Sequence, residues 1–216
     1  MTSKLTQEPW GPHPLNPDAG QMPMPTEPLE LEAALRAGRV SLRLWPYYTF
    51  RYGERGARFT ASDSAFLATL PSYPGAFVQK QIEWLGSTLS NRGMPTILLE
   101  QHLHVLSRQL QRLIPSRKAE FQRLDASAVA LRARREAVLS PRRTRGLVEV
   151  FPLEAGLPTT RLSLGTAWLL VAAVADERTG IVNAVSSIET FFLNEALFPA
   201  RFVAAARSML ERAKKA

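Results

Sequence analysis

The chain has 216 residues, of which 45% are hydrophobic and 21% charged, and its formal net charge is +8. This balance allows a substantial buried core and excludes a wholly disordered protein. Cysteine is absent, which excludes disulfides, thiolate metal sites and a cysteine nucleophile.

The first 28 residues are predicted to form a disordered, proline-rich tail. Seven of the 16 prolines lie there among polar residues. Proline removes a backbone hydrogen-bond donor and disfavours helix at the residue before it. The folded part of the chain is therefore expected to begin near residue 29.

The segment from 29 to 56 contains a short helix and an aromatic cluster. Leucines at 29, 31 and 35 suit a helix that Gly38 could end with a left-handed cap. Apolar residues then alternate with polar ones, which is the period of a strand. Trp45 and Tyr48 belong to the aromatic run that follows, and the pattern leaves open whether residues 39–52 are extended or helical.

Residues 60–140 carry the clearest helical pattern. A helix is expected to start at Thr60 or Ser62, with Asp63 favourably placed in its first turn. Gly93 and Pro95 then separate two amphipathic helices, over 76–90 and 96–114. A further helix of about 20 residues follows the break at Pro115. Together, residues 29–140 predict a helical bundle domain.

The remainder is predicted to be a basic linker, 141–146, and a smaller helical C-terminal unit, 147–216, which could also pack on the bundle as one domain. Residues 147–151 and 161–164 look extended around a turn at 154–156, which leaves room for a minor β hairpin. The apolar run 165–175 is too short for a membrane span, which needs about 20 residues. The predicted class is mainly α, without a transmembrane segment. The polar start of the chain lacks a hydrophobic signal region, so we expect a cytoplasmic location.

The positive charge is concentrated in one segment. Nine of the 27 basic and three of the 19 acidic residues lie within 115–146, so this segment carries +6 of the net +8. It includes six candidate anion- or partner-binding arginines: Arg132, Arg134, Arg135, Arg142, Arg143 and Arg145. Their guanidinium groups could pair with phosphate or carboxylate. No aromatic residue lies between them, which argues against nucleic-acid binding, and a solvated helix end is the simpler interpretation.

Candidate ligand-binding residues lie near the leucine-rich helix. His102 and His104 are two residues apart and point nearly opposite ways, so they cannot chelate one metal from that helix. His102 lies beside the leucine stripe, where it could ligate a haem-like group or respond to protons. Trp84, Trp45 and Tyr48 could line a pocket with it. Core packing of the rings and a water-satisfied histidine are the simpler alternatives.

No catalytic motif accompanies these residues. The sequence lacks a nucleophile elbow, a phosphate-binding loop, a dinucleotide fingerprint and zinc-ligand spacing. We therefore favour a non-catalytic regulatory or scaffolding module that binds another protein or itself. One alternative is a sensor of a hydrophobic or tetrapyrrole ligand, held near His102. A second is electrostatic nucleic-acid binding through the arginines of 132–145.

Overall fold

A computed structural model describes residues 13–216, and within that range the protein is mainly α, with no strand. Its helices are α1 (Pro28–Leu44), α2 (Tyr47–Thr69), α3 (Gly75–Ser90), α4 (Thr96–Leu113), α5 (Lys118–Val138), α6 (Pro141–Ala155), α7 (Arg161–Arg178), α8 (Ala184–Phe192) and α9 (Ala200–Lys215). Short 3-10 turns are η1 (Pro17–Ala19), η2 (Leu70–Ser72) and η3 (Pro115–Arg117). The predicted mainly α class is confirmed.

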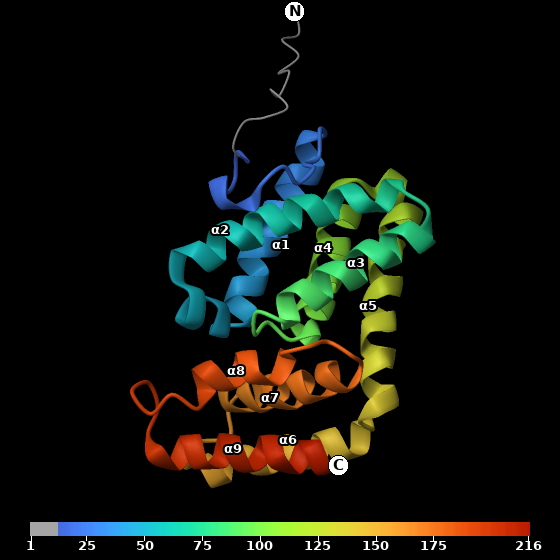
Figure 1. The fold of residues 1–216 in the computed structure, drawn as a ribbon. Helices are drawn as coiled ribbons and strands as arrows, with labels where there is room; N and C mark the ends of the chain where they lie inside the picture. The colour runs from blue at the N-terminus through green and yellow to red at the C-terminus, as the bar shows by residue number, and fades with distance from the viewer. Residues whose placement is uncertain (1–12) are drawn as a thin grey trace, which may run out of the picture.

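The helices pack around two hydrophobic clusters. One cluster lies among α1 to α5 and includes the fully buried Leu103, Leu106 and Phe121. The other lies among α6 to α9, and Tyr47, Tyr48 and Leu98 reach it from α2 and α4. Figure 1 shows α1 to α4 in the upper part and α6 to α9 in the lower part, with α5 running along one side of both.

Residues 39–52, which the sequence left open, are helical apart from a corner at Trp45 and Pro46. Gly38 does not end α1. It lies buried inside the helix, where an added Cβ would lie 3.4 Å from Ser64 Oγ on α2, so glycine permits the close approach of α1 to α2. The buried face of α1 consists largely of small residues, and the spacing of large apolar residues therefore concealed it.

The minor hairpin that the sequence left possible does not form, because residues 147–155 continue helix α6 and residues 161–164 begin helix α7. Residues 141–146 are the first turns of the same helix and not a linker. Ser140 caps this helix by accepting a hydrogen bond from the Arg143 amide, and Pro141 occupies its first position. Gly156 ends the helix with a φ of 69°. These start and stop signals in the sequence outweigh the local strand-like pattern.

The predicted tail, residues 1–28, lies only partly within the described residues. Residues 1–12 lie outside the described residues. The start of the described segment packs against α2 around η1: His13 and Asn16 are buried, and Asn16 Nδ2 donates a hydrogen bond to Ser62 Oγ at 3.4 Å. This segment is therefore part of the fold, and it lies beside the site described below.

Within residues 13–216, no helix combines the length and hydropathy that crossing a bilayer requires.

Candidate ligand-binding site

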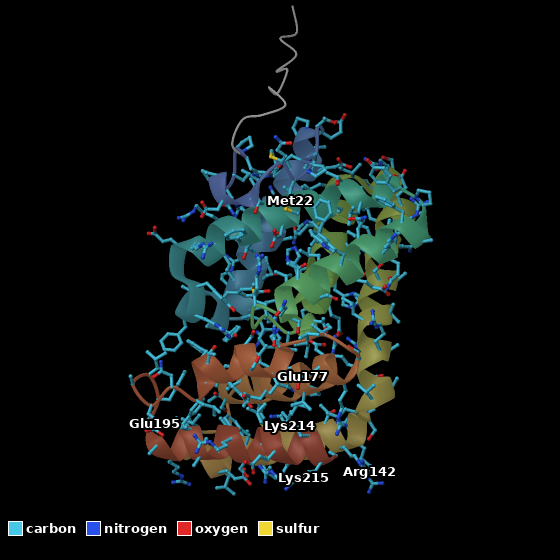
Figure 2. All side chains as sticks on the ribbon, viewed as in Figure 1. Met22, Arg142, Glu177, Glu195, Lys214 and Lys215 are labelled. Carbon is cyan, nitrogen blue, oxygen red and sulfur yellow. The ribbon has the colours of Figure 1, made fainter. Side chains whose placement is uncertain are left out.

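A cavity of about 650 Å³ lies between α1, α2, α3 and α4. Three of the four predicted ligand-binding residues line it: Tyr48, Trp84 and His102. The fourth, Trp45, lies on a different cavity. The N-terminal segment also contributes to the wall through Asp18, Ala19 and Met22. Figure 2 labels Met22 on this segment in the upper part of the molecule.

The cavity coincides with a bend in α2. Gly53 has φ 55° and ψ −143°, a conformation that side-chain-bearing residues rarely adopt, and it divides the helix into two arms. Tyr48 and Tyr52 lie before the bend, and Phe59 and Asp63 lie after it, yet all four line the cavity. The bend therefore directs side chains from both arms of one helix towards a common space.

The cavity wall is mainly apolar. Its aliphatic and thioether side chains come from the N-terminal segment and from α2, α3, α4 and the 91–95 turn; they are Met22, Leu67, Leu85, Leu89, Met94 and Leu99. Trp84 stays 54% exposed, and its ring packs edge-on against Phe66 with a centroid separation of 6.5 Å. Such a wall suits the apolar body of a small molecule.

His102 joins three helices and is held in a neutral state. Ser64 Oγ donates to the Thr60 carbonyl at 2.5 Å, so it accepts from His102 Nε2–H at 3.1 Å. The other ring nitrogen, Nδ1, then accepts from Ser41 Oγ at 2.8 Å. Burial lowers the pKa of His102 to about 4. His102 thus ties α4 to α1 and α2, and metal coordination would require breaking one of these hydrogen bonds.

Asp63 is an ionisable residue of the cavity wall with a strongly raised pKa. Burial raises its pKa from 3.8 to about 7, and the positive charge of Arg92 opposes this shift only in part. Among the described residues its carboxyl makes no hydrogen bond or ion pair. Burial also raises the pKa of Tyr48, and the charge of nearby Asp63 raises it further. A carboxyl that changes charge near neutral pH in an apolar cavity is typical of a functional site.

Sequence reasoning placed Asp63 in the first turn of a helix, where it would favour the helix dipole. The structure places it inside α2, which begins at Tyr47 and ends at Thr69, so Asp63 lies nearer the C-terminal end of the helix than its first turn. Only the packing of α1, α3 and α4 around it makes this carboxyl unusual. No local pattern could have indicated that environment.

Arg55 and Arg92 also line the cavity. Arg55 makes a loose ion pair with Asp18, at 3.8 Å between Nε and Oδ2, and both side chains are more than half exposed. Such an exposed pair contributes little to stability. The cavity therefore offers an apolar wall, the carboxyls of Asp63 and Asp18, and two guanidinium groups.

Three of the six predicted partner-binding arginines are engaged inside the molecule. Arg132 Nε lies 2.8 Å from Glu100 Oε1, and Arg135 pairs with the other oxygen of the same carboxylate. Arg134 lies 3.5 Å from Glu83. These residues stabilise the contacts of α5 with α3 and α4, and they are not a continuous free basic surface.

The other three arginines lie on α6, and all are exposed. Arg143 donates to the terminal carbonyl of Ala216. Arg142 projects away from the lower part of the molecule (Figure 2). Arg145 lines the second cavity, together with Arg132 and Arg135. The six arginines therefore do not form one binding surface.

Asp176 carries a polar role that the sequence did not reveal. Its buried carboxylate accepts hydrogen bonds from the Thr96 amide at 2.7 Å and from Ser90 Oγ at 2.8 Å. Thr96 Oγ1 donates to its second oxygen at 2.5 Å, and Arg135 donates to Thr96 Oγ1 at 2.7 Å. Asp176 of α7 thus caps α4 and joins the two parts of the fold.

Comparisons with protein-family models, with curated proteins and with solved structures find no match to this chain.

Proposed function

We propose that the protein is a non-catalytic sensor that binds an amphipathic small molecule in the first cavity, which lies among helices α1, α2, α3 and α4. The observation that carries this proposal is the 650 Å³ apolar cavity with Asp63 on its wall. A packing defect would be expected to be lined by apolar groups alone. This cavity instead combines an apolar wall with a few polar groups, as small-molecule sites do.

The ligand would lie with its apolar body against Leu85, Leu99 and Trp84. A polar group of the ligand would face Asp63 and the Tyr48 hydroxyl, neither of which has a hydrogen-bond partner among residues 13–216. Because Asp63 titrates near neutral pH, it can either donate or accept a hydrogen bond there. Polar contacts of this kind would fix the orientation of the ligand in the apolar cavity.

The contacts beside the cavity supply a route for regulation. Tyr47 and Arg51 precede the bend in α2 together with the cavity residues Tyr48 and Tyr52. The Tyr47 hydroxyl donates to the Gly93 carbonyl, and Arg51 donates to the Ser187 carbonyl on α8 at 2.7 Å. A ligand that shifts the first arm of α2 would therefore move contacts to α8.

Binding of a neutral fluorescent probe tests the proposal. N-phenyl-1-naphthylamine should bind saturably with one molecule per chain. Thr88 lines the cavity, so Thr88→Phe should fill part of it and weaken binding at least about tenfold. Ser87→Phe places the same ring on the exposed neighbour and should leave binding unchanged.

Both variants are first checked by urea unfolding, so that loss of binding is not loss of folding. Absence of saturable binding to the parent protein would refute the proposal. Equal binding by the parent and a folded Thr88→Phe variant would place the probe elsewhere and would also refute it.

The tetrapyrrole version of this proposal has less support. Both ring nitrogens of His102 already make hydrogen bonds to serines, so an axial bond must replace one of them. Titration with haem tests this version directly. A visible absorption band that His102→Ala abolishes would support coordination, whereas an unchanged free-haem spectrum would exclude it.

The protein-interaction module, which we favoured from the sequence, becomes our second candidate, and it is supported by exposed apolar side chains that include Leu153 at 78% and Leu162 at 61%. Light scattering and pull-down of a stoichiometric partner would test it, and a monomer without any partner would count against it. Nucleic-acid binding is less favoured, because Arg132, Arg134 and Arg135 are paired with acids inside the molecule.

A further inference from the structure

A second cavity, of about 420 Å³, lies where the two parts of the fold meet. Its wall combines the end of α1 with side chains of α4, α5, α6 and α7. It shares no lining residue with the first cavity. Leu139 of its wall belongs to the C-terminal hydrophobic cluster, and Trp45 and Ile97 pack against that cluster.

The charge of this cavity is positive. Four arginines and two glutamates line it: Arg132, Arg135, Arg145, Arg161, Glu100 and Glu136. Glu100 is neutralised by Arg132 and Arg135 together. No acid of residues 13–216 lies within ion-pair distance of Arg145 or Arg161. Two guanidinium groups are therefore free to bind an anion at this cavity.

The same cavity has aromatic walls. Trp45 and Trp168 both line it and are both partly buried. An added Cβ at Gly165 would lie 3.4 Å from the ring of Trp45, so glycine at this position lets the indole pack directly against α7. Aliphatic side chains of Ile97, Leu139 and Val171 complete the apolar lining. Flat, rigid indole faces of this kind suit the ring of a planar ligand.

The first turn of α6 adds to the preference for negative charge. Pro141 and Thr144, from this turn, line the cavity. The N-terminal end of a helix carries a partial positive charge, which favours a nearby anion. The helix end, the two free arginines and the net charge of the lining all favour the same sign of ligand.

We propose that this second cavity binds a planar aromatic anion. The aromatic ring would pack against Trp45 and Trp168, and the carboxylate or phosphate group would pair with Arg145 and Arg161. This site is independent of the proposed function of the first cavity, because the two cavities share no residue. In this proposal Trp45 contributes to the second cavity, whereas the sequence analysis expected it to line a pocket together with His102.

Calorimetry with three probes tests the proposal. The probes are 1-naphthoate, adenosine monophosphate and the uncharged 1-naphthalenemethanol. At least one of the two anions should bind saturably, and more weakly at higher salt. Binding of the naphthoate alone would identify a carboxylate site, and binding of the nucleotide alone a phosphate site. The uncharged probe should bind at least about tenfold more weakly than the anion.

Arginine variants locate the binding site. Arg145→Ala and, separately, Arg161→Ala should each weaken anion binding about tenfold. Arg142→Ala removes the same charge from the same helix as Arg145, but its side chain does not line the cavity, so binding should change less than about twofold. Thr88→Phe, which fills the first cavity, should have no effect. Urea unfolding checks that each variant is folded.

Three results would overturn the proposal. The first is the absence of saturable binding of either anion up to millimolar concentration. The second is an equal loss of affinity in Arg142→Ala, Arg145→Ala and Arg161→Ala, which would indicate a general response to net charge. Loss of anion binding in a folded Thr88→Phe variant would assign the anion to the first cavity and would equally refute the second site.

Discussion

Replacing Asp63 by Asn should make the protein more stable, and increasingly so as the pH rises. The pKa of Asp63 is raised from 3.8 to about 7, so the folded protein keeps a proton that the unfolded chain has released. Stability is therefore lost as the pH rises from about 4 to 7, and the loss is complete above that window. Asn carries no charge in either state, so the variant avoids the loss.

The two pKa values set the size of the effect. A difference of about three pH units, at 1.36 kcal/mol each, gives an upper bound of about 4 kcal/mol above pH 7. Water in the open cavity screens part of this charge, so we expect about 2 kcal/mol at pH 8. At pH 5 the gain should be less than about half of that value, because the pKa difference is only partly expressed there.

Urea unfolding of the parent and Asp63→Asn at pH 5 and pH 8 measures these gains. Asp18→Asn is the matched control, because Asp18 lines the same cavity but its side chain is 52% exposed. Its unfolding free energy should change by less than about 0.5 kcal/mol at both pH values. An Asp63→Asn variant that is destabilised at pH 8, or that gains equally at both pH values, would refute the reasoning.

Three further predictions concern groups around the two cavities. Asp176→Ala should lower the unfolding free energy by about 3 to 5 kcal/mol, because it leaves buried donors unpaired. As a control, Glu177→Ala at the exposed neighbouring position should lower it by less than about 1 kcal/mol. A loss below about 1 kcal/mol for Asp176→Ala would contradict this account. The ring resonances of His102 should not titrate between pH 6 and 8 in NMR spectra, because burial lowers its pKa to about 4, and a midpoint near 6.5 would show that the ring is not buried in this way. Gly93→Ala should destabilise the protein by more than about 1 kcal/mol in thermal unfolding, because the φ of Gly93 is 82° and the new methyl group would clash with the Arg51 guanidinium. An unchanged melting temperature would rule out the close contact of Arg51 with Gly93.

The predictable part of the fold is the part in which one helix face carries large apolar residues. Leu99, Leu103, Leu106 and Leu110 recur at intervals of four and three, and all four are buried on α4. Helix α1 has a buried face of alanine, glycine and serine, which contributes no comparable signal. The buried face of α1 can be identified only from the close packing of α2 and α4 on it, and this packing is a property of the tertiary structure.

The site was predictable to a similar degree. Large aromatic rings and a histidine beside the leucine stripe indicated the region of the cavity, and Tyr48, Trp84 and His102 do lie on its wall. The role of His102 was not predictable, because its two serine partners are 38 and 61 residues away in the sequence. The sequence assigned the arginines to one basic segment, since ion pairs to Glu83 and Glu100 become visible only in three dimensions.

The position of Asp63 argues that the cavity is used. A carboxyl whose charge is disfavoured by burial lowers stability at neutral pH, and an asparagine or a leucine there would avoid the loss. His102, in the same wall, shows the opposite arrangement, with both ring nitrogens paired and the neutral form preferred. One polar group of this wall is thus paired within the protein, while the Asp63 carboxyl makes no hydrogen bond or ion pair with residues 13–216. Residues that reduce stability in this way are concentrated at functional sites, where a ligand supplies the missing interaction.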